Sequence, residues 1–136
     1  MSHTFHKIYY HLVWSTKYRA PLISPSVEAD IRIQVFQRIK KIGARQLALN
    51  MTEDHIHLLV DFPPSVALSD FVHDIKGGSA HYINAKNKEL SLRWQNGYGA
   101  LTLSEDRTPN VIRYIKNQKQ HHASNYLWQD YESVGI

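Results

Sequence analysis

The sequence contains no cysteine, and it has no apolar run long enough for a membrane-spanning helix. Without cysteine the chain has no disulfide, no thiolate metal ligand and no cysteine nucleophile, which suits a reducing compartment. A transmembrane helix needs about 18 or more consecutive apolar residues. The first residues also lack the charged-then-apolar order of a signal peptide. We therefore expect a cytoplasmic protein.

Acidic residues are absent from two segments of the chain. Residues 1–27 contain Lys7, Lys17 and Arg19 but no carboxylate, and residues 107–122 contain four cationic side chains and no carboxylate. The formal net charge of +4 is a mild excess that is consistent with a polyanionic partner. The two segments form either one cationic patch or two separate solvated faces, and the sequence leaves both possibilities open.

The composition indicates one globular domain over residues 1–136, because 43% of the residues are hydrophobic and 21% are charged. Hydrophobic periodicity predicts strands over residues 8–15, 44–50, 55–62 and 97–103, and helices over 25–42, about 65–86 and 110–127. This β-α-β-β-α-β-α order predicts an α+β fold, a split βαβ sandwich of the ferredoxin-like (RRM-like) type. Its sheet is antiparallel, and the last helix is an addition to the sandwich.

Local signals refine the ends and the middle of the predicted helices. Ser24 or Ser26 is expected to cap the first helix, and Thr108 or Asn110 the third. The pair Gly77-Gly78 interrupts the second helix. It indicates either a kink or a surface that another chain or a nucleic acid approaches closely, with the kink favoured.

Two histidines lie one residue apart in the third predicted strand. The chain has nine histidines, so a single His-x-His pair is close to the chance expectation. Because side chains alternate across a strand, His55 and His57 lie on one face of the sheet, about 7 Å apart, while Ile56 faces the helices. The pair is either half of a metal site or two histidines that are exposed at the surface or hydrogen-bonded. His11 points to the same face or to the core.

Tyr114 and Gln118 lie four residues apart on the last predicted helix, and therefore on the same helical face. If that face lies against the two histidines, Gln118 can supply a third ligand to a metal ion and Tyr114 can attack a bound phosphate. A tyrosine nucleophile has an ordinary pKa near 10 and needs a metal ion or a cationic neighbour. A tyrosine on a helix is usually a core or rim residue, so the pair alone is weak evidence for such a site.

Five segments of this sequence, in this order, resemble the single-tyrosine transposases of the HUH endonuclease superfamily. These enzymes include those of insertion sequences and the REP-associated tyrosine transposases. The segments are "YYHLVWSTKYRAPLI", "MTEDHIHLLVDFPPS", "SDFVHDIKGGSAHYIN", "LRWQNGYGALTLS" and "VIRYIKNQKQHH".

The resemblance implies a site and a reaction. His55, His57 and Gln118 would bind Mg²⁺ or Mn²⁺, and Tyr114 would cut and rejoin single-stranded DNA through a 5′-phosphotyrosine link. It also implies DNA partners with element ends or repeat hairpins, a homodimer that can share its active sites, action at the nucleoid and no nucleotide cofactor. Predicted DNA-contact residues are Lys17, Arg19, Lys76, Arg113, Lys116 and Lys119.

Aromatic residues near the first cationic segment have two interpretations. Tyr10, Trp14 and Tyr18 are expected to be packing residues, although an aromatic ring beside Lys17 and Arg19 is also able to stack on a base.

Three alternative functions share much of this pattern. A non-catalytic RNA-recognition module is disfavoured, because in "NGYGALTL" Asn96 replaces a basic residue and Ala100 and Leu103 stand where stacking aromatic residues are needed. A hydrolytic metal nuclease would use water and leave Tyr114 incidental. A domesticated, non-mobilising nuclease or sequence-specific single-stranded DNA-binding protein of the same fold would share every residue named above.

Overall fold

Among the residues that it describes, 4–123 (side chains through residue 120), the computed structural model forms a four-stranded antiparallel sheet. The strands are β1 (Tyr9–Ser15), β2 (Arg45–Met51), β3 (His55–Asp61) and β4 (Gly99–Leu103), in the order β2-β3-β1-β4. This is the strand order of the ferredoxin-like sandwich, so the predicted fold class is confirmed. The turn after Met51 joins β2 to β3 as a hairpin, as the sequence predicted.

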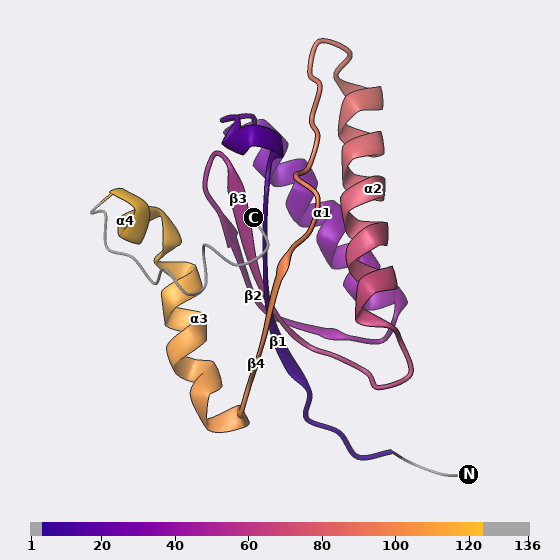
Figure 1. The fold of residues 1–136 in the computed structure, drawn as a ribbon, viewed down its shortest axis with the longest axis vertical. Helices are drawn as coiled ribbons and strands as arrows, with labels where there is room; N and C mark the ends of the chain where they lie inside the picture. The colour runs from indigo at the N-terminus through magenta and orange to yellow at the C-terminus, as the bar shows by residue number, and fades with distance from the viewer. Residues whose placement is uncertain (1–3, 124–136) are drawn as a thin grey trace.

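Helices cover both faces of the sheet (Figure 1). The long helices α1 (Pro25–Lys41) and α2 (Leu68–Lys86) lie on one side, and α3 (Thr108–Lys116) and α4 (Gln118–Ala123) on the other. Two short 3-10 helices, η1 (Lys17–Arg19) and η2 (Glu105–Arg107), follow β1 and β4. Ser24 caps α1 by accepting a hydrogen bond from the Val27 amide. None of the helices in the described part of the chain is both long and apolar enough to cross a membrane.

The two faces of the sheet have different compositions. The face under α1 and α2, here called the apolar face, carries the larger hydrophobic core, with Leu12, Ile56 and Leu58 fully buried. The face under α3, here called the histidine face, carries a smaller apolar cluster beside buried polar side chains. Because both faces are covered, β1 and β3 are buried along nearly their whole length.

Helix α2 runs without interruption through Gly77 and Gly78, so the predicted kink is wrong. A Cβ atom at Gly78 would overlap the guanidinium of Arg38 on α1, while Gly77 has open space around it. Arg38 crosses to α2 and donates to the Asp74 carbonyl at 3.2 Å. The glycine at position 78 therefore permits a close approach between two helices of the protein itself.

The last predicted helix is divided in two at Asn117. Asn117 has φ −95° and ψ 16°, which ends α3, and α4 begins at Gln118. The helix also starts earlier than expected, at Thr108, with Arg107 at the N-cap and no side-chain cap, so the predicted capping by Thr108 or Asn110 is wrong. The expected continuation through residues 124–127 lies outside the described residues.

Candidate active site

Strand β3 places His55 and His57 side by side on the histidine face. Both are fully buried, and their ring centroids lie 5.1 Å apart. The intervening Ile56 belongs to the apolar core, as strand alternation requires. The predicted shared face is confirmed, although α3 covers it and the two rings are not exposed.

The ring of His55 is fixed by its neighbours at one nitrogen. His55 Nδ1 lies 2.8 Å from Asp54 Oδ1, 2.9 Å from Thr52 Oγ1 and 3.4 Å from the guanidinium of Arg19. The shortest of these contacts is to a carboxylate, which assigns Nδ1 as the donor and leaves the lone pair on Nε2. A carboxylate that holds the far nitrogen in this way is typical of metal-binding histidines.

Asp54 is kept in its ionised form. Burial would raise the pKa of its carboxyl, but the hydrogen bond from His55 and the ion pair with Arg19 outweigh burial and hold that pKa well below its usual range. The ion pair joins Arg19 Nε to Asp54 Oδ2 at 3.3 Å. Asp54 therefore acts as a permanent acceptor for the His55 ring.

His57 is held by a third histidine. His11 on β1 is fully buried, and its Nε2 lies 2.9 Å from His57 Nδ1. Burial lowers the pKa of His11 to about 4, so at neutral pH its ring is uncharged and able to accept a hydrogen bond. If His57 donates from Nδ1, its Nε2 carries the lone pair that a metal ion needs.

The sequence left His11 undecided, and the structure assigns it to the histidine face. Every residue of β1 except Tyr10 is buried, so no alternation of polar and apolar residues marks its two faces. The pairing of His11 with Leu59 on β3 fixes its direction, and pairing register is not visible in the sequence.

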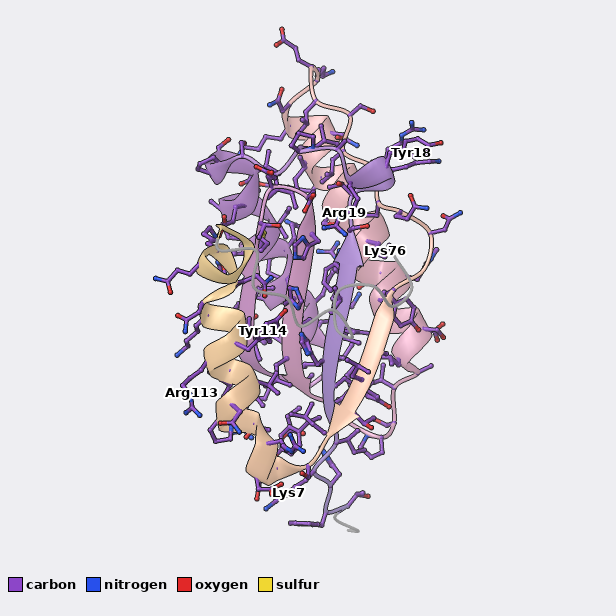
Figure 2. The ribbon with its side chains drawn as sticks, turned by 60° about the vertical axis from the view of Figure 1, so that its left-hand side comes forward. Lys7, Tyr18, Arg19, Lys76, Arg113 and Tyr114 are labelled. Carbon is purple, nitrogen blue, oxygen red and sulfur yellow. The ribbon has the colours of Figure 1, made fainter. Side chains whose placement is uncertain are left out.

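Helix α3 brings Tyr114 over these rings. The Tyr114 ring centroid lies 5.6 Å from that of His57 and 6.2 Å from that of His11, with both pairs edge to face. Figure 2 shows Tyr114 pointing from α3 toward the sheet and Arg113 pointing away from it. The contact is maintained by apolar packing between α3 and the sheet. It involves Val111, Tyr114 and Ile115 of α3 with Tyr9, Ala48 and Leu59.

Gln118 reaches the same site from the start of α4. Its side chain is fully buried, and its Nε2 lies 3.4 Å from His55 Nε2. A glutamine amide can present its oxygen or its nitrogen at the same point, because the two atoms exchange by rotation. Asn50 fixes the helix break by donating to the carbonyls of Ile115 at 3.0 Å and Lys116 at 3.1 Å. Asn50 thus supports the position of Gln118, and the sequence patterns did not single it out.

The assembled donor set fits a divalent ion. The described residues contain no group of three His, Cys, Asp or Glu side chains that could hold a metal ion. A metal site at this position would therefore also need the amide of Gln118 as a ligand. Two imidazole nitrogens with one amide oxygen suit Mn²⁺, or Mg²⁺ when phosphate or water oxygens complete its shell. The hydrogen bond that His55 donates to Asp54 and the hydrogen bond between His57 and His11 are the supporting contacts expected of such a site.

The predicted DNA-contact residues occupy different environments. Lys17 and Arg19 lie in η1 at the His55 end of the sheet, while Arg113 and Lys116 are exposed on α3. Two others make contacts within the protein. Lys76 donates to the carbonyls of Gln95 at 2.7 Å and Gly97 at 2.8 Å, and Lys119 donates to Asn50, Met51 and Glu28.

The cationic residues of the first segment, residues 1–27, do not gather in one place. Figure 2 shows Lys7 and Arg19 at opposite ends of the sheet. Each is paired with a carboxylate, Lys7 with Glu105 at 2.9 Å and Arg19 with Asp54 at 3.3 Å.

The amino-acid sequence matches the family model described as "Transposase IS200 like" over residues 4–118. Similar curated proteins include the ISDra2 transposase TnpA of Deinococcus radiodurans, 28% identical over 119 residues, which cover 83% of this chain and 85% of the relative. The transposase for insertion sequence element IS200 of Salmonella typhimurium is 27% identical over 128 residues, covering 87% of this chain and 81% of the relative.

Two solved structures share the fold. The crystal structure of a putative transposase from Deinococcus radiodurans R1 superposes with a TM-score of 0.71 at 29% identity, covering 87% of this chain and 95% of that one. A REP-associated tyrosine transposase bound to a REP hairpin superposes with a TM-score of 0.70 at 14% identity, covering 90% of this chain and 73% of that one.

Proposed function

The chain belongs to the IS200-like transposase family, and from this premise we propose that it cuts and rejoins single-stranded DNA with Tyr114 as its nucleophile. One observation carries the proposal. Tyr114 and Gln118 converge on His55 and His57 from a distant part of the chain, with the Tyr114 ring 5.6 Å from His57 and the Gln118 amide 3.4 Å from His55.

In the proposed cleavage step, the Tyr114 hydroxyl oxygen attacks a backbone phosphorus and loses its proton. A bond forms between Tyr114 and the 5′-phosphate, the bond from phosphorus to the 3′ oxygen breaks, and that oxygen takes up a proton. His55, His57 and Gln118 would hold Mg²⁺ or Mn²⁺, whose charge would stabilise the phosphate oxygens in the transition state.

The proposed rejoining step is the reverse reaction with a new partner strand. A free 3′-hydroxyl attacks the phosphotyrosine, and Tyr114 leaves with a proton restored. The number and type of bonds are unchanged, so strand transfer needs no nucleotide cofactor. Phosphoryl transfer depends mainly on positioning and charge stabilisation. The buried, hydrogen-bonded side chains of the site would supply the positioning.

One structural relative supports the class of DNA that we propose as substrate. That protein is bound to a REP hairpin, and we extend this to a single-stranded substrate with a hairpin near the cleavage site. The resemblance also implied a homodimer with shared active sites. In this structure, one chain brings all four proposed site residues together, so we propose that a single chain is able to form a complete site.

A covalent-trapping experiment tests the proposed function. The protein is incubated with Mn²⁺ and single-stranded oligonucleotides that carry hairpins, and the products are separated by denaturing electrophoresis. We expect a protein–DNA adduct and, by mass spectrometry after nuclease digestion, a phosphate-linked modification on Tyr114. Cleaved DNA with free 5′-phosphates and no adduct would instead support hydrolysis by water.

A further inference from the structure

Tyr18 stands apart from the other aromatic residues of its segment. Trp14 is buried in the apolar core and Tyr10 packs edge-on against Phe62 at 5.4 Å, as expected for packing residues. The side chain of Tyr18 is 81% exposed. The expectation that Tyr18 also packs is therefore wrong, and the alternative of a stacking ring applies to it.

The backbone holds Tyr18 in a conformation that favours glycine. Tyr18 has φ 59° and ψ 21°, and Arg19 follows with φ 55°. Two consecutive left-handed residues with side chains are rare, and such strain persists only where surrounding contacts impose it. Here Thr16 Oγ1 donates to the Ala20 carbonyl at 2.7 Å, and the Tyr18 amide donates to Gln95 Oε1 at 3.3 Å. A bulky ring is thus kept in a position that glycine would occupy without strain.

The surroundings of the ring match the chemistry of a nucleotide. Lys17 Nζ lies 5.6 Å from the ring centroid, and the guanidinium of Arg19 lies 3.4 Å from His55 Nδ1. Figure 2 shows Tyr18 and Arg19 together at one end of the sheet, with Tyr18 directed outward. An exposed aromatic ring with one cation beside it and a second at the next residue offers a surface for a base and charges for its flanking phosphates.

We propose that Tyr18 is a stacking platform for an unpaired base of the DNA strand that enters the active site at its His55 end. This inference rests on the proposed function and adds a binding position outside the catalytic residues. Stacking on an aromatic ring tolerates any base, since every base has a π-face, but it requires a base that is not already stacked in a duplex. The platform would therefore select single strands without selecting sequence.

Replacing Tyr18 with glycine and with phenylalanine separates binding from folding. Affinity is measured by fluorescence anisotropy with a labelled deoxythymidine homopolymer, and stability by thermal unfolding. We expect Tyr18→Gly to bind about tenfold more weakly, with a Tm that is unchanged or higher because glycine relieves the left-handed strain. Tyr18→Phe keeps the ring and is expected to bind like the unaltered protein.

Phe36→Ala is the matched control, because Phe36 is an exposed aromatic residue in the second half of α1, away from η1 in the sequence. The DNA affinity of this variant is expected to be unchanged. If Tyr18→Gly binds as well as the unaltered protein, the platform is overturned and the proposed function stands. A lower Tm with a parallel loss of binding overturns it too, because the ring would then support the fold. If the unaltered protein binds neither this homopolymer nor a single strand that carries a hairpin, the proposed function itself fails.

Discussion

The two faces of the sheet are built from the same strands but are stabilised in different ways. On the apolar face, Ile56 and Leu58 of β3 are buried against two long helices. On the histidine face, His55 and His57 of the same strand are buried under the short helix α3 and need polar partners. One strand thus supplies a hydrophobic core with one half of its residues and the proposed active site with the other half.

This difference separates stability from chemistry. Burying an apolar side chain contributes about 1.5–3 kcal/mol to folding, whereas a buried imidazole without a hydrogen-bond partner is destabilising. The histidine face offsets that penalty with Asp54, Thr52 and His11. Substitutions on the apolar face should therefore affect unfolding first, and those on the histidine face should affect metal binding and DNA cleavage first.

The largest effect is expected from Tyr114→Phe, which removes only the proposed attacking oxygen. Cleavage of single-stranded DNA, followed by denaturing electrophoresis, should fall by at least roughly a thousandfold. Binding of the same oligonucleotide should change little, because the ring and its edge-to-face contacts remain. A Phe variant that still cuts would exclude Tyr114 as the nucleophile.

Leu58 and Leu59 allow the two faces to be compared at adjacent, fully buried positions. Leu58→Ala leaves a cavity in the apolar core and should lower the free energy of unfolding by about 2–5 kcal/mol in urea titrations. Leu59 lies under α3, which is anchored by fewer apolar residues. Leu59→Ala should therefore lower the free energy of unfolding by less than Leu58→Ala does, while reducing DNA cleavage more. Equal losses of stability and activity in both variants would contradict the division between faces.

An intermediate effect is expected at His11, measured as Mn²⁺ affinity by calorimetric titration. His11→Leu removes the acceptor for His57 Nδ1 and should weaken Mn²⁺ binding by about 10- to 100-fold. His11→Gln keeps an acceptor oxygen near the same point and should recover most of the affinity. Equal affinities for the Leu variant and the unaltered protein would show that His11 does not position His57.

The smallest effect concerns Glu28, which links the two faces around the β2 edge. Burial would raise the pKa of Glu28, but the hydrogen bonds from Arg32 and Lys119 outweigh it and lower the pKa below 4.5. The ionised carboxylate therefore stabilises the fold above that pH, and this stabilisation is lost as the pH falls below 4.5.

Unfolding in urea at several acidic pH values measures this loss. The exposed partners limit the contribution to less than about 1 kcal/mol. The Glu28→Gln variant should show a weaker pH dependence, while a steeper loss of stability in that variant would reverse the sign of the argument.

Much of this arrangement is readable from the sequence, and the unreadable parts have identifiable physical reasons. Alternation predicted that His55 and His57 share a face, and helical spacing predicted that Tyr114 and Gln118 share one. That the two pairs meet was implied by the family resemblance. The break at Asn117 was missed because asparagine is tolerated inside helices and the carbonyls it exposes are satisfied by Asn50, a partner distant in sequence. His11 was undecided because pairing register, and not local pattern, sets its direction.

The position of β1 at the centre of the sheet has a consequence for protein synthesis. β1 pairs with β3 and with β4, and the proposed site extends from His11 near the start of the chain to Gln118 near its end. Pairing over such sequence separations forms late in folding. A nascent chain is therefore expected to be unable to cut DNA until Gln118 has left the ribosome, because the proposed site needs segments from β1 through α4.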